Sequence, residues 1–346
     1  MPPHKILFRC DSSQKIGTGH VMRCLVLAKQ FRAAGSQVSF ICHAYQGNIN
    51  FRILEAGFKI HILAEQSHQE DLKDLCQLIN VEAAKLLCID HYDYSSEEES
   101  LIKQQTQGKI LVLDDLLLHH QCDFVLNHGI GALPQQYSTL VPDNCKLYVG
   151  AQYFLLRDEF KAQMSNITVS QRAKPRLLVT LGGGDPNGVN DVLIKLLNQL
   201  PTPLAIDYVL TSSNEDRMQL IEQLDSGKHN VNTHIDCSNM SILMAQASCA
   251  IIAGGGTLIE CLYMRLLTIA IQLTDNQSKN IKFLKQQKIG FVIDNYPAEL
   301  NYNTIHHYLT EMFAQKANQE YRKKIDAILP QCPLNVPNLI LSELNE

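Results

Sequence analysis

The sequence predicts an α/β protein of two domains, each built on a parallel β-sheet that helices cover. With 346 residues the chain is too long for one typical domain and long enough for two. In both halves, short apolar runs alternate with helical segments, which is typical of parallel sheets. A polar stretch without periodicity, KAQMSNITVSQRAKP, lies between Phe160 and Pro175. We therefore expect domains at residues 1–160 and 175–336.

The first half repeats a strand and helix unit. Gly35 ends the first expected helix, and Ser95 and Ser96 each stand three residues before a glutamate, which is a helix start signal. Strands are expected at Lys5–Phe8, Gln37–Cys42, Lys59–Leu63, Lys85–Asp90 and Lys109–Asp114, with helices at Val21–Ala34, Asn48–Ala56, Glu70–Val81 and Ser96–Gln107.

The second half opens in the same way, with a strand, a glycine-bearing loop and a helix. Strands are expected at Arg176–Thr180, Ala205–Leu210, Val231–Ile235, Cys249–Ala253 and Leu267–Gln272, with helices at Val189–Gln199, Glu215–Leu224 and Asn239–Ala247.

Composition narrows the class of partner. The formal net charge of -5 provides no polybasic surface for nucleic acid or anionic lipid. No apolar run approaches the roughly 20 residues of a membrane-spanning helix, and the N-terminus has no secretory signal pattern. We expect a cytoplasmic monomer that binds a small molecule, with no nucleic-acid or membrane partner.

The 11 cysteines are scattered and odd in number, and several lie in apolar runs. Buried free thiols fit this pattern better than disulfides. There is no C-x-x-C pair and no Cys/His group with zinc-ligand spacing. We expect neither a metal nor a cofactor.

The first candidate motif is Gly17-Thr18-Gly19-His20, after the first strand and at the start of a helix. Glycines allow backbone N–H groups to approach an anion, and a helix N-terminus adds partial positive charge. The same field favours a neutral imidazole, so His20 is a candidate general base. The alternative is a tight turn in which His20 only caps the helix.

The second motif, Gly254-Gly255-Gly256-Thr257 with Glu260 one turn later, again follows a strand and opens a helix. Bare backbone at a helix N-terminus suits a diphosphate, and the carboxylate of Glu260 could accept both hydroxyls of a ribose. The alternative is a capping box formed by Thr257 and Glu260.

The third motif is the loop from Gly182 to Gly188, in which Gly183, Gly184 and Asp185 are candidate ligand contacts. Two such loops at the carboxyl ends of parallel strands would converge on one crevice. The alternative is ordinary turn and N-cap chemistry.

Two further strands end in polar residues. Tyr92 follows one of them and could orient a water or a sugar hydroxyl. Asp114 and Asp115 follow the other, and adjacent carboxylates more often cap loops than hold Mg²⁺. His119 and His120 look like solvated loop residues.

Seven ordered blocks carry a resemblance to a known family over nearly the whole chain. The sequence resembles the pseudaminic acid pathway hydrolases that act on UDP-2,4-diacetamido-2,4,6-trideoxy-β-L-altropyranose, which are themselves similar to MurG-like glycosyltransferases. The blocks are FRCDSSQKIGTGHVMRCLVLA, CIDHYD, LVLDDL, VGAQYFLLRDEF, LVTLGGGDPN, NMSILMAQA and AGGGTLIE, followed by DNQ.

The resemblance implies a GT-B architecture, in which two Rossmann-like domains face one cleft and a C-terminal helix, here about 337–346, crosses back to the first domain. It implies that His20 activates water with Tyr92 beside it, that Glu260 holds the ribose and that Asn276 reaches the sugar. The substrate-binding residues would be Asp11, Gly17, Gly19, Gly183, Gly184, Asp185, Gly255, Gly256, Thr257, Glu260, Asn276 and Gln277.

The chain departs from the family pattern in three places. Gly256 replaces a serine, with Leu258 and Ile259 after the threonine instead of an aromatic residue. His43 stands where arginine is common, and Asn127-His128-Gly129 replaces an N-Q-N pattern.

The resulting hypothesis is metal-independent hydrolysis of a UDP-sugar to UDP and free sugar, by water attack at the anomeric carbon. One alternative is a GT-B glycosyltransferase that uses a UDP-sugar donor. The other is a non-catalytic nucleotide-sugar binding protein, which the altered glycine block would allow. Release of UDP without an acceptor separates the first from the other two.

Overall fold

A computed structural model describes residues 3–64, 67–164, 175–182, 185, 187–212, 214, 216–330 and 333–345. The chain forms two compact units, Met1–Leu155 together with Cys332–Glu346, and Leu156–Gln331. Most of the linker expected between Phe160 and Pro175 lies outside the described residues.

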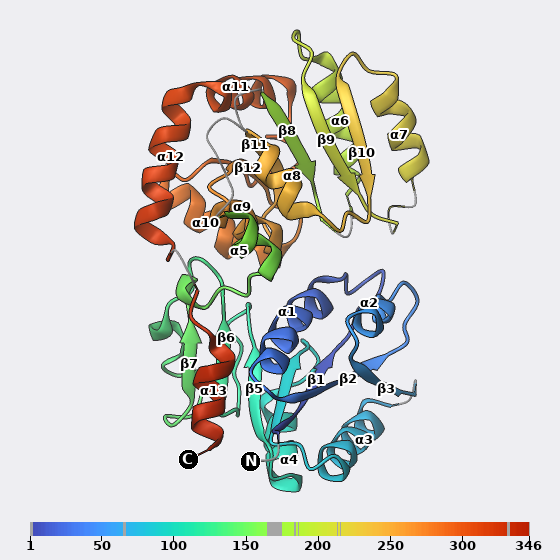
Figure 1. Ribbon diagram of the computed structural model, residues 1–346, viewed down its shortest axis with the longest axis vertical. Coiled ribbons are helices and arrows are strands. Elements are labelled where there is room, and N and C mark those ends of the chain that lie inside the picture. The colour runs from blue at the N-terminus through green and yellow to red at the C-terminus, as the bar shows by residue number, and fades with distance from the viewer. Residues whose placement is uncertain are drawn as a thin grey trace. The chain divides into compact units, whose positions relative to one another are not determined.

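The N-terminal unit is built on a seven-stranded parallel sheet of order β3-β2-β1-β4-β5-β6-β7 (Figure 1). Its strands are β1 (Lys5–Cys10), β2 (Gln37–His43), β3 (Lys59–Leu63), β4 (Leu86–Asp90), β5 (Lys109–Leu113), β6 (Phe124–Asn127) and β7 (Lys146–Val149). The first five were predicted. The last two, of four residues each, are too short to show periodicity.

Helices cover both faces of this sheet, because successive strand residues point to opposite sides. In β1, Ile6 and Phe8 belong to one core, whereas Leu7 belongs to the other. The helical segments are α1 (Gly19–Ala33), α2 (Asn50–Glu55), α3 (His68–Val81), α4 (Ser96–Gln105), η1 (Pro134–Tyr137), η2 (Ala151–Tyr153) and α13 (Val336–Leu344).

Helix α4 begins at the capping box that Ser95 forms with Glu98. The hydroxyl of Ser95 accepts from the backbone N–H of Glu98, and the Glu98 carboxylate accepts from the backbone N–H of Ser95. The second serine and glutamate pair is not used as a cap. Glu99 is fully buried instead, and its carboxylate is bonded to His120.

Helix α13 belongs to the N-terminal unit, although it comes from the other end of the chain. It packs against α1, and Val336 and Ile340 enter the core that contains Phe8. His4 and Asn345 are hydrogen-bonded at 3.0 Å, so the described ends of the chain lie side by side. Figure 1 shows α13 beside β7.

The C-terminal unit has a six-stranded parallel sheet of order β10-β9-β8-β11-β12-β13. Its strands are β8 (Arg176–Thr180), β9 (Ala205–Leu210), β10 (Asn230–Ile235), β11 (Cys249–Ala253), β12 (Leu267–Ile271) and β13 (Phe291–Ile293). Its helical segments are α5 (Asp158–Met164), α6 (Val189–Gln199), α7 (Arg217–Asp225), α8 (Met240–Gln246), α9 (Gly256–Tyr263), η4 (Asp275–Gln277), α10 (Ser278–Gln287), α11 (Tyr302–Phe313) and α12 (Gln315–Ile328).

Both units therefore have the predicted α/β arrangement, and strand β13 is the one described strand here that the sequence did not indicate. All strands are parallel, but successive strands are added toward one edge of the sheet and then toward the other. This reversal in the order of the strands falls between β1 and β4 in the first unit and between β8 and β11 in the second. Parallel sheets bind ligands beyond the carboxyl ends of the strands at such a reversal. The reversal points are thus the places to look for the site.

Ten cysteines are described, and all ten are free thiols, eight of them buried. The expectation of buried free thiols is correct for these residues. Among the described residues, no helix is both long and apolar enough to cross a membrane.

Candidate functional site

The predicted glycine loop lies at the strand reversal of the N-terminal unit. β1 and β4 are neighbours, with Cys10 opposite Asp90 in the register. The loop after β1 turns through Gly17, whose φ of 79° is a left-handed conformation that favours glycine, and α1 begins at Gly19. This turn places His20 in the first turn of α1, beside the end of β4.

His20 is bonded to Asp90. Its Nδ1 lies 2.6 Å from Oδ1 of Asp90, and the histidine side chain is only 8% exposed while the carboxylate is fully buried. A carboxylate oxygen accepts and does not donate, so Nδ1 carries the proton of this bond. Nε2 then remains to accept a proton. The structure therefore gives His20 a partner instead of the isolated helix-capping role left open by the sequence.

Arg23, one turn further along α1, completes this group of charges. Its guanidinium donates to both oxygens of Asp90, and Nη1 donates to Oδ2 of Asp115 at 2.6 Å. Arg23 Nη2 is also 3.2 Å from Nδ1 of His20. Both nitrogens donate to Oδ1 of Asp90, so they are neighbours and not partners of each other. The three side chains hold one another in place.

The charges of this group are fixed by these contacts. Burial by itself would raise the pKa of Asp90, but Arg23 and His20 outweigh it and hold that pKa well below its usual range. Burial likewise opposes the charged form of Arg23, and Asp90 and Asp115 raise its pKa instead. Asp90 therefore stays ionised at neutral pH and can stabilise an imidazolium on His20.

Tyr92 stands beside His20, as the sequence suggested. The two rings meet edge to face with centroids 4.7 Å apart. The hydroxyl of Tyr92 donates to Oδ1 of Asp115 at 2.9 Å, and the residue is 40% exposed. Asp115 thus orients both Tyr92 and Arg23.

Asp11, expected to contact substrate, is fully buried in a separate network. Its Oδ2 pairs with Arg9 at 2.8 Å and with Nε2 of His91 at 3.1 Å, and its Oδ1 accepts the backbone N–H of His43. These contacts hold the pKa of Asp11 below its usual range despite burial. With its oxygens taken by protein donors, Asp11 positions the loops after β1, β2 and β4.

Two of the departures from the family pattern now have a location. His43 is buried, with Nδ1 3.0 Å from Asp11 and Nε2 3.0 Å from Asp71, so this position belongs to the Asp11 network. His128 has a buried Nδ1 without a hydrogen-bond partner among the described residues. Burial, with Arg23 nearby, lowers the pKa of His128 to about 4, so this imidazole is neutral at pH 7.

Asp114 caps a loop, which is the role the sequence favoured over metal binding. Its carboxylate accepts the backbone N–H groups of Leu116 and Leu117 and the hydroxyl of Tyr137. The expectation of a solvated His120 was wrong. This residue is 4% exposed, because Nδ1 is bonded at 2.8 Å to the buried carboxylate of Glu99.

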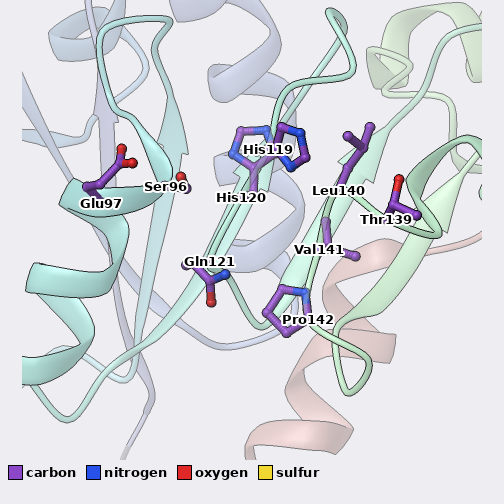
Figure 2. Close-up of a pocket in the computed structure, with 9 residues that line it drawn as sticks. All are labelled: Ser96, Glu97, His119, His120, Gln121, Thr139, Leu140, Val141 and Pro142. Carbon is purple, nitrogen blue, oxygen red and sulfur yellow. The ribbon is translucent and has the colours of Figure 1, made fainter.

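A pocket of about 430 Å³ adjoins His120. Figure 2 shows it between the start of α4, the loop that carries His119 and His120, and the loop before β7. None of the predicted site residues lines it. Its lining consists of Ser96, Glu97, His119, His120, Gln121, Thr139, Leu140, Val141 and Pro142.

The glycine-rich block of the C-terminal unit follows β11, at the strand reversal. Gly254 is required by packing, since a Cβ there would lie 2.8 Å from Ile281. A Cβ on Gly256 would meet nothing within 4 Å, and one on Gly255 only Gln277 at 3.9 Å. Local packing does not explain these two glycines, which leave the backbone open at the N-terminus of α9.

Glu260 is not a helix cap. Helix α9 starts after Gly255 without a side-chain cap, so the capping-box alternative is not what the structure shows. The Glu260 carboxylate instead receives Arg157 Nε at 2.8 Å and Nη2 at 3.0 Å. Burial raises the pKa of Glu260, and Arg157 opposes that shift. Each oxygen keeps a lone pair for a further donor.

The remaining predicted contacts have local roles. Asn276 is exposed and accepts from the hydroxyl of Thr274, while Gln277 accepts the backbone N–H of Leu273. Asp185 accepts the N–H groups of Val189 and Asn190, both at 2.7 Å, so it fixes the start of α6. Gly183 and Gly184 lie outside the described residues.

Comparison with known proteins identifies relatives of this chain. No protein-family model matches the chain. The UDP-2,4-diacetamido-2,4,6-trideoxy-beta-L-altropyranose hydrolase of Campylobacter jejuni is 32% identical over 283 residues, which cover 82% of this chain and 97% of that protein. The chain belongs to this hydrolase family. The Bacillus subtilis spore coat polysaccharide biosynthesis protein SpsG is 23% identical, with 80% of each chain covered.

Solved structures agree with the fold of the hydrolase family. Acinetobacter baumannii MurG matches with a TM-score of 0.69 at 15% identity, covering 99% of this chain and all of that one. The kitacinnamycin glycosyltransferase matches with a TM-score of 0.67 at 13% identity and similar coverage. The GT-B fold class is therefore confirmed.

Sequence reasoning gave no role to two residues that the structure places in contact with predicted site residues. Asp90 was seen only as a polar strand end, and Arg157 only as part of a matching block. Each is far in sequence from its partner, 70 positions from His20 and 103 from Glu260. If β1 had been expected to pair with β4, Asp90 at the end of β4 would have been placed beside the loop that follows β1 and carries His20.

Proposed function

We propose that this protein hydrolyses a UDP-linked 2,4-diacetamido-2,4,6-trideoxy hexose to UDP and free sugar, in the pseudaminic acid pathway. The observation that carries the proposal is the buried His20 and Asp90 pair, in a chain 32% identical to a hydrolase of that substrate. An imidazole backed by an ionised carboxylate is the usual arrangement of a general base.

In the proposed reaction, Nε2 of His20 takes a proton from water as the water oxygen bonds to the anomeric carbon. Asp90 accepts a hydrogen bond from Nδ1–H and, as a carboxylate, stabilises the imidazolium that forms. Tyr92, held by Asp115, orients the water or a sugar hydroxyl beside the histidine ring. The anomeric carbon to oxygen bond breaks, and its electron pair leaves with UDP.

The C-terminal unit is assigned to the nucleotide. Glu260 accepts the ribose hydroxyls, and the open backbone of Gly255, Gly256 and Thr257 faces the diphosphate at the start of α9. Arg157 adds a cation next to Glu260. The backbone N–H groups at the start of α9 supply the partial positive charge that stabilises a departing diphosphate, so we propose a reaction without metal.

The deciding experiment incubates the purified protein with the UDP-sugar alone and measures UDP release. Release without an acceptor supports hydrolysis. A GT-B glycosyltransferase would release UDP only after an acceptor is added, and a binding protein would release none. A panel of UDP-sugars then defines the sugar. The expectations of a monomer and of a cytoplasmic location stay predictions.

A further inference from the structure

A buried histidine lies between two buried carboxylates, hydrogen-bonded to one and at ion-pair distance from the other, and its Nε2 has no hydrogen-bond partner among the described residues. Nδ1 of His120 lies 2.8 Å from Oε1 of Glu99, and its Nε2 lies 4.0 Å from Oδ1 of Asp114. The side chains of the three residues are at most 4% exposed. The group joins α4, through Glu99, to the loop that follows β5. Figure 2 shows His120 in this loop, against the pocket.

The two carboxylates of the group are hydrogen-bonded to the backbone of a constrained loop. Asp114 accepts the backbone N–H of Leu116 at 2.8 Å and that of Leu117 at 3.1 Å. Leu117 has a φ of 63°, a left-handed conformation that costs free energy for a leucine and persists only where surrounding contacts enforce it. The loop is fixed at its other end by Glu99, whose Oε2 accepts the backbone N–H of Gln121.

The same loop carries Asp115, which touches the proposed reaction centre. Asp115 receives Arg23 at 2.6 Å and Tyr92 at 2.9 Å, and Arg23 in turn donates to the carboxylate that holds His20. A movement of the loop would therefore change the position of Tyr92 and of Arg23. His120 itself takes no part in the proposed reaction.

We propose that His120, as an imidazolium between Glu99 and Asp114, is a positioning residue that holds Asp115 in the orientation needed by Arg23 and Tyr92. This inference rests on the proposed function. His120 touches no substrate and acts through Asp114 and the loop backbone. Removal of its charge leaves two buried carboxylates without a cation between them, which favours rearrangement of the loop.

The charges around His120 support this role. Burial by itself lowers the pKa of His120, but Asp114 and Glu99 outweigh it and raise the pKa to about 9. Other titratable groups here are Tyr137, which donates to Asp114, Cys145, near the start of β7, and Glu97 and His119, which line the same pocket as His120. His120 is therefore charged at neutral pH and becomes neutral as the pH rises through about 9.

The first test compares His120→Gln with His119→Gln, a matched change at the exposed neighbour, in UDP release from the UDP-sugar. For His120→Gln we expect kcat to fall about tenfold at pH 7.5 with KM changed less than about twofold, since the reacting groups are misplaced while the nucleotide contacts persist. His119→Gln should match the wild type. An unchanged kcat in folded His120→Gln would overturn the proposal.

A second variant guards against misfolding of the first. Glu99→Gln keeps the size and shape of the side chain but replaces one of its two acceptor oxygens by a donor and removes the negative charge, so His120 loses its proton at lower pH. We expect the alkaline decline of kcat to move about one pH unit lower than in the wild type. An alkaline decline at the wild-type position would contradict the proposal.

The third readout needs no turnover. The ¹⁵N and ¹H signals of the His20 imidazole at pH 7 should shift in His120→Gln but not in His119→Gln, because the Arg23 and Asp115 contacts are altered. Unshifted His20 signals would overturn the role of His120. A wild-type protein that releases no UDP would instead reject the proposed function, and the two failures are thus distinguishable.

Discussion

Nδ1 of His20 lies 2.6 Å from Oδ1 of Asp90, across 70 positions of the chain. This contact fixes which ring nitrogen carries the proton. In Asp90→Asn, the amide nitrogen can face Nδ1 and favour the tautomer whose Nε2 is protonated and unable to accept. We predict that kcat falls by roughly 10² to 10⁴. The check is UDP release by the folded variant, with Asp93→Asn as a control at an exposed carboxylate.

Replacement of the histidine itself should be equally severe. His20→Asn removes the base, and we expect kcat to fall by roughly 10² to 10⁴ while the affinity for UDP stays nearly unchanged. Groups that act as a unit are not additive, so His20→Asn combined with Asp90→Asn should be no slower than His20→Asn alone. A folded His20→Asn variant with wild-type turnover would disprove the assignment.

Glu260 should matter for UDP binding more than for stability. Glu260→Gln removes the charged acceptor of the ribose hydroxyls, and we predict that UDP binds more weakly by about 1 to 3 kcal/mol in calorimetry. The matched control is Glu159→Gln, because Glu159 also pairs with Arg157, at 2.8 Å, but is not assigned to ribose. Unchanged UDP affinity with a lower melting temperature would make Glu260 a structural residue.

The raised pKa of His120 predicts a pH dependence of folding. The pKa of a histidine is ordinarily about 6.5 and that of His120 is about 9 in the folded protein, so the folded state binds the proton more tightly. The stabilisation is complete below about pH 6.5 and is lost as the pH rises through about 9. It amounts to about 3 to 4 kcal/mol, since each pKa unit corresponds to about 1.4 kcal/mol.

Denaturant unfolding at pH 6 to 10 would measure this loss. The wild type and His119→Gln should lose stability between about pH 6.5 and about pH 9, whereas His120→Gln should start less stable and show a flatter curve. Equal slopes in all three proteins would mean that His120 does not hold its proton in the folded state.

The sequence predicted the parts of the structure that local patterns determine. Strands such as Lys59–Leu63 and Arg176–Thr180 match the predicted bounds, because an apolar run between turn residues indicates a strand. The glycine loop before His20 was also predicted from a local pattern, the glycines that follow the first strand. The structure agrees, since Gly17 adopts a left-handed conformation. Strand β13 and the four-residue strand β7 carry too few residues for a pattern to show.

The partners of the site residues could not be read from local patterns. A single sequence does not say which carboxylate meets His20, and the pairing depends on strand order. His120 was mistaken for a solvated residue, and its neighbours, Leu118 and His119, are exposed in the structure. Its burial depends on Glu99, which approaches from α4 and which local reasoning had read as a second capping signal.

The last prediction concerns which bond breaks, and it needs no variant. If His20 delivers water to the anomeric carbon, oxygen from solvent ends on the sugar and UDP keeps the bridging oxygen. Water attack on phosphorus would place that oxygen on a phosphate product. We predict carbon attack, because phosphoryl transfer usually employs a metal, and the carboxylates of Asp114 and Asp115 already accept protein donors. Turnover should therefore persist in EDTA. We expect unlabelled UDP from a reaction in H₂¹⁸O with chelator, measured by mass spectrometry before the free sugar exchanges its anomeric oxygen. Labelled UDP, or UMP with a sugar phosphate, would refute carbon attack, and loss of turnover with chelator would make Asp114 and Asp115 candidate metal ligands again.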